Sequence, residues 1–423
     1  MRQMKDSGVE WIGSVPDVWE LGQIGHLYSE RKEKVSDFDY PPLSVTMKGV
    51  LPQLSTAAKS DAHDDRKLIR KGDFAINSRS DRRGSCGISP CDGSVSLINT
   101  ILTPRNEMNP RYYNWLFHTN EFADEFYKWG HGIVDDLWTT NWSDMKKMVV
   151  TIPSLTEQQN IADYLDCQCT LIDNIIEKTK TSIEEYTKLK QAIITQAVTK
   201  GVRGDRSMKE SGIDWIGSIP EEWSIEKTKT IAKRIVVGVV IKPAEYFDEN
   251  GTVPFLRGVN IKEYSINPEP MVYISEDSNH MNSKSIIHTG DILIVRDGSI
   301  GVSCVVPTEY DGSNVVSLII VSCIDSVDPH YLTYSLNSTI GKTQFELMKI
   351  GSALTHTSVQ SVSKILHAIP DIDEQIEIVE FLDNKSSEIN SIISNKEQLI
   401  ADLESYKKSL IYEYVTGKKE VAS

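Results

Sequence analysis

The sequence predicts an α+β protein with an internal pseudo-twofold repeat, in which two β-rich domains are separated by two long helices. The stretch 152–201 returns as 369–418 without a gap, at a constant offset of 217 residues. The opening stretch Met4–Trp19 returns as Met208–Trp223, with ten of sixteen positions identical. Between these repeats, each half carries short β-branched runs bounded by Gly, Pro or Asp, which is typical of strands.

Each copy of the longer repeat predicts one amphipathic helix. Its apolar residues recur every three or four positions, as in a coiled-coil seam. We expect the helices to start with Thr156 and Asp373 as N-caps, and Thr156 with Gln159 fits a capping box. Gly201 and Gly417 predict the helix ends. The predicted seam residues are Ile172, Ile175, Ile176, Ile183, Tyr186, Leu189, Ile193 and Ala197, then Ile389, Ile392, Ile393, Leu399, Ile400, Leu403, Tyr406, Leu410 and Tyr414.

Neither helix can bury its apolar stripe alone, so the simplest arrangement is that the two pack against each other. From Gln168 to Thr199 the helix rises about 48 Å. Such a pair would hold whatever lies at its two ends at a fixed separation. A coiled coil that joins separate chains is the alternative reading of the same pattern.

The repeats place the predicted boundaries at 1–151, 152–205, 206–368 and 369–423. The first and third segments are the β-rich domains, and each ends in a helical piece. The second and fourth are the long helices. The repeated Trp-Ile-Gly-Ser segment near the start of each half predicts a structural clasp around a turn.

Composition narrows the possible partners. The chain has 423 residues and a net charge of −15, which disfavours nucleic acid over the surface as a whole. Between Lys48 and Arg83, however, nine basic residues stand against five acidic ones, so a local nucleic-acid surface is possible. Six cysteines without a C-x-x-C pair and no long apolar run predict a cytoplasmic protein with no membrane contact.

Motifs that carry chemistry are weak in this sequence. Asn109-Pro110-Arg111-Tyr112 is better explained as a helix start than as a methyltransferase motif. Gly341-Lys342-Thr343 lacks the upstream glycine that a phosphate-binding loop needs. A loose nuclease-like pattern of carboxylates and lysine around 16–32 has no equivalent in the second half. The sequence therefore predicts two copies of a binding scaffold and no catalytic, cofactor or metal site of its own.

Together these motifs resemble the specificity subunits of type I restriction–modification enzymes over essentially the full length. The resemblance rests on the I-P-x-x-x-E-Q segment, the long helix that ends in V-T-K-G or V-T-G-K, and the W-I-G-S-x-P opening. It also rests on the Gly-Asp turns at Gly72 and Gly290. All four features occur twice and in the same order.

The resemblance implies two target recognition domains, each reading one half of a bipartite site in double-stranded DNA, and two antiparallel helices that set the spacer between the half-sites. It also implies two methyltransferase subunits that carry S-adenosylmethionine. A nuclease-translocase subunit that uses ATP and Mg would join them for cleavage. The chain itself would be a non-catalytic DNA-binding subunit.

DNA contacts favour Lys and Arg on loops, because both bind phosphates and both can read guanine. For the first domain we predict Lys48, Arg79, Arg82 and Arg83, of which the last three lie in the small, polar and basic stretch SRSDRRGS. For the second domain we predict Arg257, Asn260, Lys262, Arg296 and His356. The alternatives are a solvated turn at 78–85 and a structural pair between Arg296 and Asp297.

Two other classes of function stay open at this point. A self-contained DNA-modifying enzyme would need a cofactor or metal motif. A structural coiled-coil adaptor would bind no DNA and would not depend on the basic loop.

Overall fold

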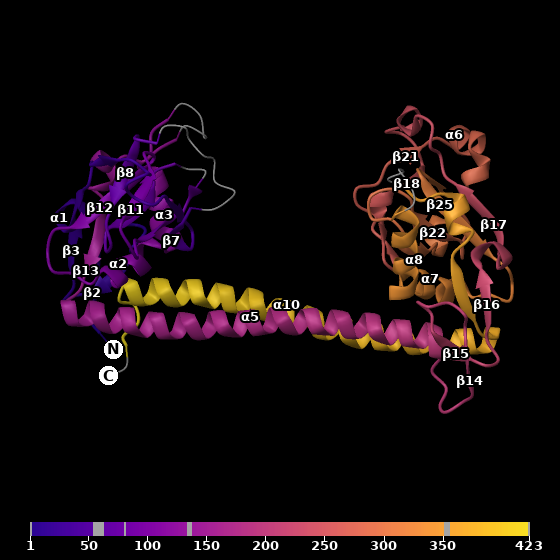
Figure 1. The fold of residues 1–423 in the computed structure, drawn as a ribbon. Helices are drawn as coiled ribbons and strands as arrows, with labels where there is room; N and C mark the ends of the chain where they lie inside the picture. The colour runs from indigo at the N-terminus through magenta and orange to yellow at the C-terminus, as the bar shows by residue number, and fades with distance from the viewer. Residues whose placement is uncertain (1, 54–62, 80–81, 133–137, 351–355, 422–423) are drawn as a thin grey trace. The chain divides into compact units, whose positions relative to one another are not determined.

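The computed structural model describes residues 2–53, 63–79, 82–132, 138–350 and 356–421. These residues form two compact units (Figure 1). Unit 1 comprises residues 1–180 together with 397–423, and unit 2 comprises 181–396. Helices and sheets are both present in each unit, and the predicted α+β class is confirmed.

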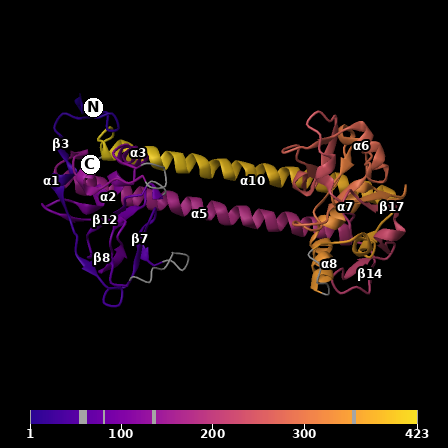
Figure 2. The ribbon, with the colours of Figure 1, turned by 90° about the horizontal axis from the view of Figure 1, so that it is seen from above.

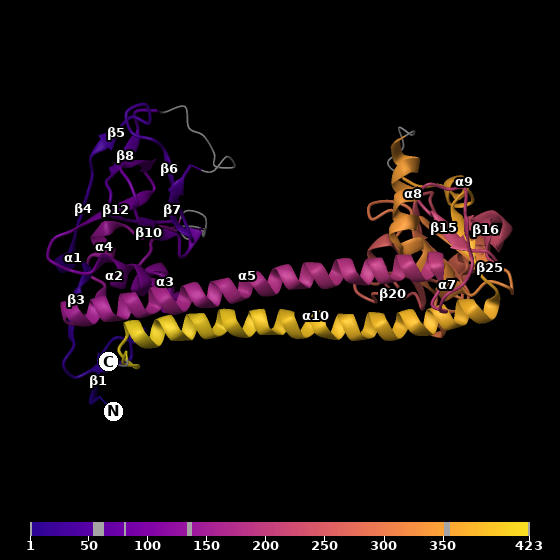
Figure 3. The same cartoon turned by 60° about the horizontal axis from the view of Figure 1, so that its bottom comes forward.

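Unit 1 is built on the antiparallel sheet β10-β9-β12-β4, with the smaller sheet β11-β8-β5 beside it. Helices α2 and α3 lie between the four-stranded sheet and the start of the long helix α5 (Figure 3). Its elements are β1 (Met4–Asp6), β2 (Ser14–Pro16), β3 (Glu20–Gln23), α1 (Ile24–Leu27), β4 (Tyr28–Glu30), β5 (Lys34–Val35), β6 (Leu43–Thr46), β7 (Gly49–Pro52), β8 (Arg66–Ile69), β9 (Phe74–Asn77), β10 (Cys86–Ile88), β11 (Gly93–Ser96), β12 (Asn99–Pro104), α2 (Pro110–Phe117), α3 (Asn120–Lys128), α4 (Trp142–Met145) and β13 (Val149–Ile152).

Unit 2 repeats this plan with the antiparallel sheet β17-β25-β22-β23 and the smaller sheet β21-β18-β24. Its elements are β14 (Met208–Glu210), β15 (Ser218–Pro220), β16 (Ser224–Lys227), β17 (Ala232–Val237), β18 (Val253–Leu256), β19 (Ile261–Lys262), β20 (Ser265–Ile266), β21 (Tyr273–Ile274), α6 (Glu276–Met281), β22 (Ile292–Val295), β23 (Ser303–Val305), β24 (Asn314–Val315), β25 (Leu318–Cys323), α7 (Pro329–Asn337), α8 (Thr339–Ile350), α9 (Val359–Val362) and β26 (Leu366–Ile369). Short 3-10 turns include η3 (Thr228–Thr230) and η5 (Gly258–Asn260).

The two long helices are α5 (Leu155–Lys200) and α10 (Ile372–Val415), and both continue from one unit into the other (Figure 2). They end before Gly201 and Gly417, which adopt the left-handed φ values of +74° and +73°, as predicted. Within the described ranges, no helix is long and apolar enough to cross a membrane.

The predicted helix starts are wrong by two residues. Ser154 Oγ accepts the backbone N–H of Glu157 at 3.3 Å, and Asp371 Oδ1 accepts that of Glu374 at 2.8 Å. These side chains are therefore the caps, while Thr156 already lies in the first turn. The capping box predicted for Thr156 does not form, because Gln159 instead donates to Asp163 at 2.8 Å.

In unit 1 the first part of α5 packs antiparallel to the last part of α10. The rings of Tyr164 and Tyr414 stack with centroids 4.5 Å apart, and Lys407 Nζ forms an ion pair with Asp173 Oδ1 at 2.6 Å. The contacts pair residues 164 and 173 of α5 with residues 414 and 407 of α10, so the two helices run in opposite directions.

In unit 2 the last part of α5 packs against the first part of α10 in the same sense. Lys190 Nζ donates to Asn390 Oδ1 at 2.9 Å, and Arg203 Nε donates to Glu377 Oε2 at 2.8 Å. Lys190 is the repeat equivalent of Lys407, and Asn390 is the repeat equivalent of Asp173, each pair being 217 positions apart. The same cross-helix contact therefore occurs in both units.

The Glu-Gln pair of the repeated motif ties each domain to the start of its own long helix. Glu157 accepts the indole N–H of Trp19 at 2.7 Å, and Glu374 accepts that of Trp223 at 3.0 Å. Both indoles are buried. The adjacent Gln375 accepts the backbone N–H of Asp328, at the N-cap of α7, at 2.8 Å. The tryptophan that ends each opening repeat, Trp19 or Trp223, is thus fixed by the motif that begins the helix.

Each domain also holds the end of the other long helix. In unit 1 the hydroxyl of Tyr112 donates to the carbonyl of Val415 at 2.8 Å, and in unit 2 that of Tyr331 donates to the carbonyl of Ala368 at 2.6 Å and lies 3.4 Å from that of Val198. Burial raises the pKa of both tyrosines well above the usual value, so the hydroxyls stay protonated. The Val-Thr ending of the repeat therefore belongs to the core of the opposite domain.

Several predicted seam residues are only half covered. Ile172 and Ile176 are buried, but Ile175 is 47% exposed and Leu189 is 49% exposed. The apolar stripe on each long helix spans several neighbouring positions around the helix, which makes it wider than one partner helix can cover. The seam prediction is therefore correct for Ile172 and Ile176, which are buried, and wrong for Ile175 and Leu189, which stay half exposed.

A buried histidine makes the stability of unit 2 depend on pH. His367 on β26 is enclosed between Thr228 Oγ1 at 3.0 Å and Ser335 Oγ at 2.8 Å, and burial lowers its pKa to about 3. Between pH 6.5 and 3 the unfolded chain takes up a proton there that the folded chain does not. We therefore expect the free energy of unfolding to fall with decreasing pH in this window, by up to about 1.4 kcal/mol per pH unit from this residue.

Urea unfolding of the wild type and of His367→Gln at pH 4, 5 and 6 measures this contribution. The variant should be less stable at pH 6 but should show a shallower decline towards pH 4. Equal slopes for the two proteins would contradict the assignment.

Candidate nucleic-acid interface

Unit 2 carries an open hollow of about 460 Å³ where three strands end. Arg257 follows β18, Lys262 is on β19, and Arg296 follows β22, and all three line it. Small residues such as Gly258 and Gly298 keep the backbone of the rim accessible. Folding thus brings together three of the five basic or polar residues predicted for the second domain, from positions up to 39 residues apart.

The two arginines of this basic hollow are incompletely bonded. Arg257 Nη2 donates to the carbonyl of Pro270 at 2.8 Å, but its Nε is buried and meets no acceptor among the described residues. The same holds for Nε of Arg296. An unsatisfied buried donor costs about 1–3 kcal/mol. Nε is buried in both side chains, so a phosphate or guanine oxygen at the hollow would bond the outer guanidinium nitrogens.

Asn260 lies beneath the hollow and is fully buried. Its Oδ1 accepts the backbone N–H of Arg257 at 3.0 Å, and its Nδ2 donates to the carbonyls of Asn267 and Pro270, each at 3.1 Å. With both ends of the amide used, Asn260 shapes the loop that presents Arg257. In this conformation its side chain offers no surface for a direct contact with DNA.

His356 is half-buried at the edge of the same region. It forms a β-bridge with Asp297, and the next residue, Thr357, donates its N–H to the carbonyl of Arg296 at 3.0 Å. The structural alternative for Arg296 is weak, because its Nε lies 3.9 Å from the Asp297 carboxylate. Asp297 is 54% exposed on the rim, where a carboxylate can accept from the amino group of cytosine.

In unit 1 the three predicted arginines lie in the loop between β9 and β10. Arg79 and Arg82 are exposed, and Arg79 is held by a bond from its backbone N–H to Asn77 Oδ1 at 3.0 Å. Arg83 turns towards α3, where it pairs with Asp124 and stacks over the ring of Tyr127 at 4.9 Å. A phosphate would have to compete with Asp124 for Arg83.

Lys48 is exposed at the turn of the β6–β7 hairpin. The neighbouring Gly49 packs against Gly87 on β10, since a Cβ added to Gly87 would lie 2.7 Å from Gly49 Cα. The hairpin tip is thus placed beside the strand that leaves the basic loop. Residues 80 and 81 of that loop lie outside the described residues.

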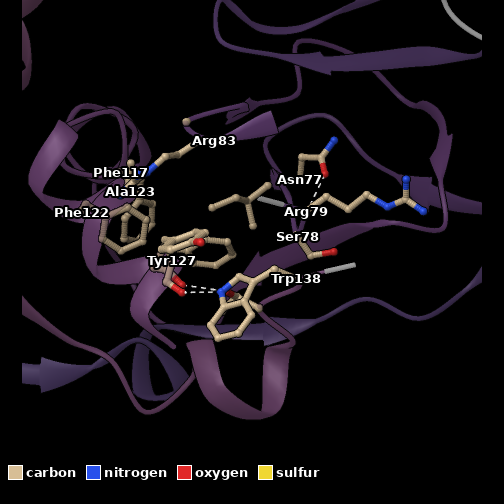
Figure 4. A pocket seen from close by; sticks show the side chains of 13 residues that line it. Asn77, Ser78, Arg79, Arg83, Phe117, Phe122, Ala123, Tyr127 and Trp138 are labelled. Atoms are coloured by element: carbon tan, nitrogen blue, oxygen red, sulfur yellow. Dashed lines mark hydrogen bonds between the residues drawn. The ribbon is translucent and has the colours of Figure 1, made fainter. Parts of the chain in front are cut away.

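Beside the β9–β10 loop, aromatic side chains surround a small pocket that the sequence did not predict (Figure 4). Phe117 on α2, Phe122 and Tyr127 on α3, and Trp138 converge there, and Arg79 extends away from them. The indole N–H of Trp138 donates to the carbonyl of Tyr127 at 2.9 Å. Its only sequence signal was the aromatic content of the 110–130 helical piece.

The two units present different chemistry on the same backbone frame. Arg79 forms a β-bridge with Thr139, and the equivalent bridge in unit 2 joins Asp297 to His356. A cation in one unit therefore stands where the other has an anion. This substitution alone makes identical ligands for the two units improbable on electrostatic grounds.

Among the described residues, His, Cys, Asp and Glu side chains form no cluster of three that could hold a metal ion. Burial raises the pKa of the Cys304 and Cys323 thiols to about 12, so neither is a reactive thiolate at neutral pH.

Comparisons with known proteins agree with this geometry. The family profile described as the type I restriction modification DNA specificity domain matches residues 220–402. Two relatives come from Methanocaldococcus jannaschii. The type I restriction enzyme MjaVIII specificity subunit is 25% identical over 87% of this chain and 86% of its own length. The putative type I restriction enzyme MjaX specificity subunit is 26% identical over 88% and 87%.

Two solved structures share the fold. A chain of a type I R-M system, studied for its assembly and conformational transition, superposes with a TM-score of 0.76 at 14% identity and covers 96% of this chain and 99% of its own length. The HsdS subunit of Thermoanaerobacter tengcongensis superposes with a TM-score of 0.56 at 15% identity, covering 98% and 100%. With the repeated motifs and the paired helices, the chain carries a type I restriction modification DNA specificity domain and is similar over most of its length to specificity subunits of type I restriction enzymes.

Proposed function

We propose that this chain is the DNA-recognition subunit of a type I restriction–modification complex, and that each unit reads one half of a bipartite site in double-stranded DNA. The basic hollow of unit 2 is the observation that carries the proposal. Three cationic side chains, Arg257, Lys262 and Arg296, line an open concave surface where phosphate or guanine oxygens can accept hydrogen bonds.

The different side chains on equivalent positions of the two units support two different half-site sequences. Arg79 in unit 1 favours phosphate or guanine, whereas Asp297 in unit 2 favours the amino group of cytosine. We propose direct or phosphate contacts for Lys48, Arg79, Arg82, Arg257, Lys262, Arg296 and His356, a weaker contact for Arg83, and a supporting part for Asn260.

Exposed apolar side chains on the long helices support docking of partner subunits. In unit 1, Ile175 and Tyr406 are 47% and 53% exposed, and both lie within two residues of the Asp173–Lys407 ion pair. These two exposed side chains, beside a fixed polar contact, are the apolar patch that we propose for docking.

Unit 2 repeats this patch. Leu189 and Ile392 are 49% and 36% exposed, and both lie within two residues of the Lys190–Asn390 hydrogen bond. Two equivalent patches suit two copies of the same partner. We propose that they receive two methyltransferase subunits.

In this proposal the chemistry belongs to the partners. The methyltransferase subunits would carry S-adenosylmethionine, and a restriction subunit with ATP and Mg would join them for cleavage. The chain itself would be non-catalytic and would act in the cytoplasm. An adaptor without DNA binding is disfavoured by the open basic hollow.

Mapping DNA methylation in the host, with and without this gene, tests the function. We expect one bipartite methylated motif to disappear with the gene and to return with it. An unchanged methylation pattern would refute the proposal.

The same measurement tests whether the helix pair sets the spacer. Inserting seven residues after Thr179 and after Lys396, at the boundary between the two compact units, keeps the apolar faces aligned to within about 20°. Each helix becomes about 10 Å longer, which matches about three base pairs of DNA. Among insertion variants that methylate DNA, we expect the same two half-sites with a longer gap. The same half-sites at the original gap would exclude the helices as spacer.

A further inference from the structure

The aromatic pocket of unit 1 has the size of a single small group. Its open volume is about 20 Å³, enough for one water-sized group but far too small for an aromatic base. Its apolar lining includes Phe117, Phe122 and Phe126, all of them buried, and the small side chain of Ala123 on α3.

The polar groups in the wall are already bonded to the protein. The indole N–H of Trp138 donates to the carbonyl of Tyr127 at 2.9 Å, and the hydroxyl of Thr140 donates to the carbonyl of Phe126 at 2.6 Å. A buried water needs two to four polar partners, whereas an apolar group needs none. The pocket therefore suits a methyl group better than a water molecule.

The rim of the pocket is basic. Arg79 and Arg83 line it, and the Arg79 side chain leads away from the apolar lining (Figure 4). Cationic side chains around an apolar depression match DNA, in which phosphates flank the C5-methyl group that thymine exposes in the major groove.

At the corresponding place of unit 2, an aromatic ring lies against a glycine. Phe345 follows Pro329 by the same sixteen residues that separate Phe126 from Pro110. Its ring lies against Gly301, where an added Cβ would be 2.4 Å from the ring.

We propose that this pocket receives the C5-methyl group of one thymine in the half-site that unit 1 reads, and so makes thymine a required base there. This inference rests on the proposed function. Only the methyl group distinguishes thymine from uracil at this position, so deoxyuridine is the direct probe.

The test uses the full chain in complex with its methyltransferase partner. A bound sequence is first selected from a random duplex library, and each thymine of the selected duplex is then replaced singly by deoxyuridine. We expect one replacement, in one half-site, to weaken binding about fourfold, the effect of one buried methyl-sized group. Deoxyuridine elsewhere should change the dissociation constant less than twofold.

Ala123→Leu is expected to fill the pocket. It should abolish the preference for that thymine and leave the other half-site unchanged. Asn120→Leu, an exposed position on the same helix, is the matched control and should retain the preference. If Ala123→Leu fails to fold, the deoxyuridine series on the wild-type chain decides alone.

Three results would overturn the inference: a selected site without thymine in the half-site that unit 1 reads, deoxyuridine effects below twofold at every position, or a deoxyuridine loss that persists in Ala123→Leu. A library that yields no enriched sequence would instead refute the proposed function itself.

Discussion

Replacing Glu374 by alanine is expected to lower the free energy of unfolding by about 3–5 kcal/mol, because it removes one partner of a buried ion pair. The Glu374 side chain is fully buried and accepts the indole N–H of Trp223. Its Oε1 lies 2.7 Å from Nη2 of Arg206, whose side chain is only 13% exposed. Without the carboxylate, the one remaining anionic partner that Arg206 has among the described residues is the exposed Glu222, at 3.0 Å, and its Nη2 still donates to the carbonyl of Lys200.

Two further variants show whether burial is the cause. Glu377→Ala, one turn further along α10, removes a carboxylate that is 49% exposed and should cost less than about 1 kcal/mol. Glu157→Ala, at the equivalent position of unit 1, should fall between the two, since that side chain is 19% exposed. Chemical denaturation measures all three, and equal losses for Glu374→Ala and Glu377→Ala would contradict the argument.

The double variant Arg257→Ala with Arg296→Ala is expected to weaken binding to the selected DNA by about 10²–10⁴-fold, because each base or phosphate contact contributes about 1–3 kcal/mol. Both guanidinium groups line the same hollow, so their loss leaves only Lys262 of the three cations there. If the contacts are to bases, specificity should relax in one half-site only. If they are to phosphates, affinity should fall for all sequences, with a smaller salt dependence.

The matched control removes the same charge from the same unit. Lys227 and Lys229 are exposed and do not line the hollow. Lys227→Ala with Lys229→Ala should therefore change binding less than about threefold, through long-range electrostatics alone. A titration of the complex on labelled duplex at two salt concentrations measures both doubles. Similar losses in the two would show that the hollow has no special part in binding.

The repeated motifs carried most of the fold prediction, because they report contacts that must be made twice. Glu157 and Glu374 recur since each bonds a buried tryptophan, and the glycines after the helices recur since each takes a left-handed φ. The helix caps were misjudged because Ser154 precedes Leu155, an apolar residue that is 42% exposed and does not continue the buried stripe.

The interface was harder to predict, because its geometry depends on residues distant in the chain. Basic loops could be located from composition, and Arg257, Lys262 and Arg296 do meet in one hollow. The burial of Asn260 depends on a loop that closes ten residues later at Pro270. The aromatic pocket requires Trp138 to pack beside α3, a contact that no local pattern encodes.

The exchange of helix ends between the two units has a consequence for synthesis of the protein. The core of unit 1 includes Leu410 and Val415, and Arg2 lies 3.5 Å from Glu420 near the other end of the chain. Domains at the N-terminus generally fold first as they leave the ribosome. Here the domain that is made first cannot complete its interior until Leu410 and Val415 have been translated, so a nascent chain must keep an unfinished apolar surface while the whole of unit 2 is made.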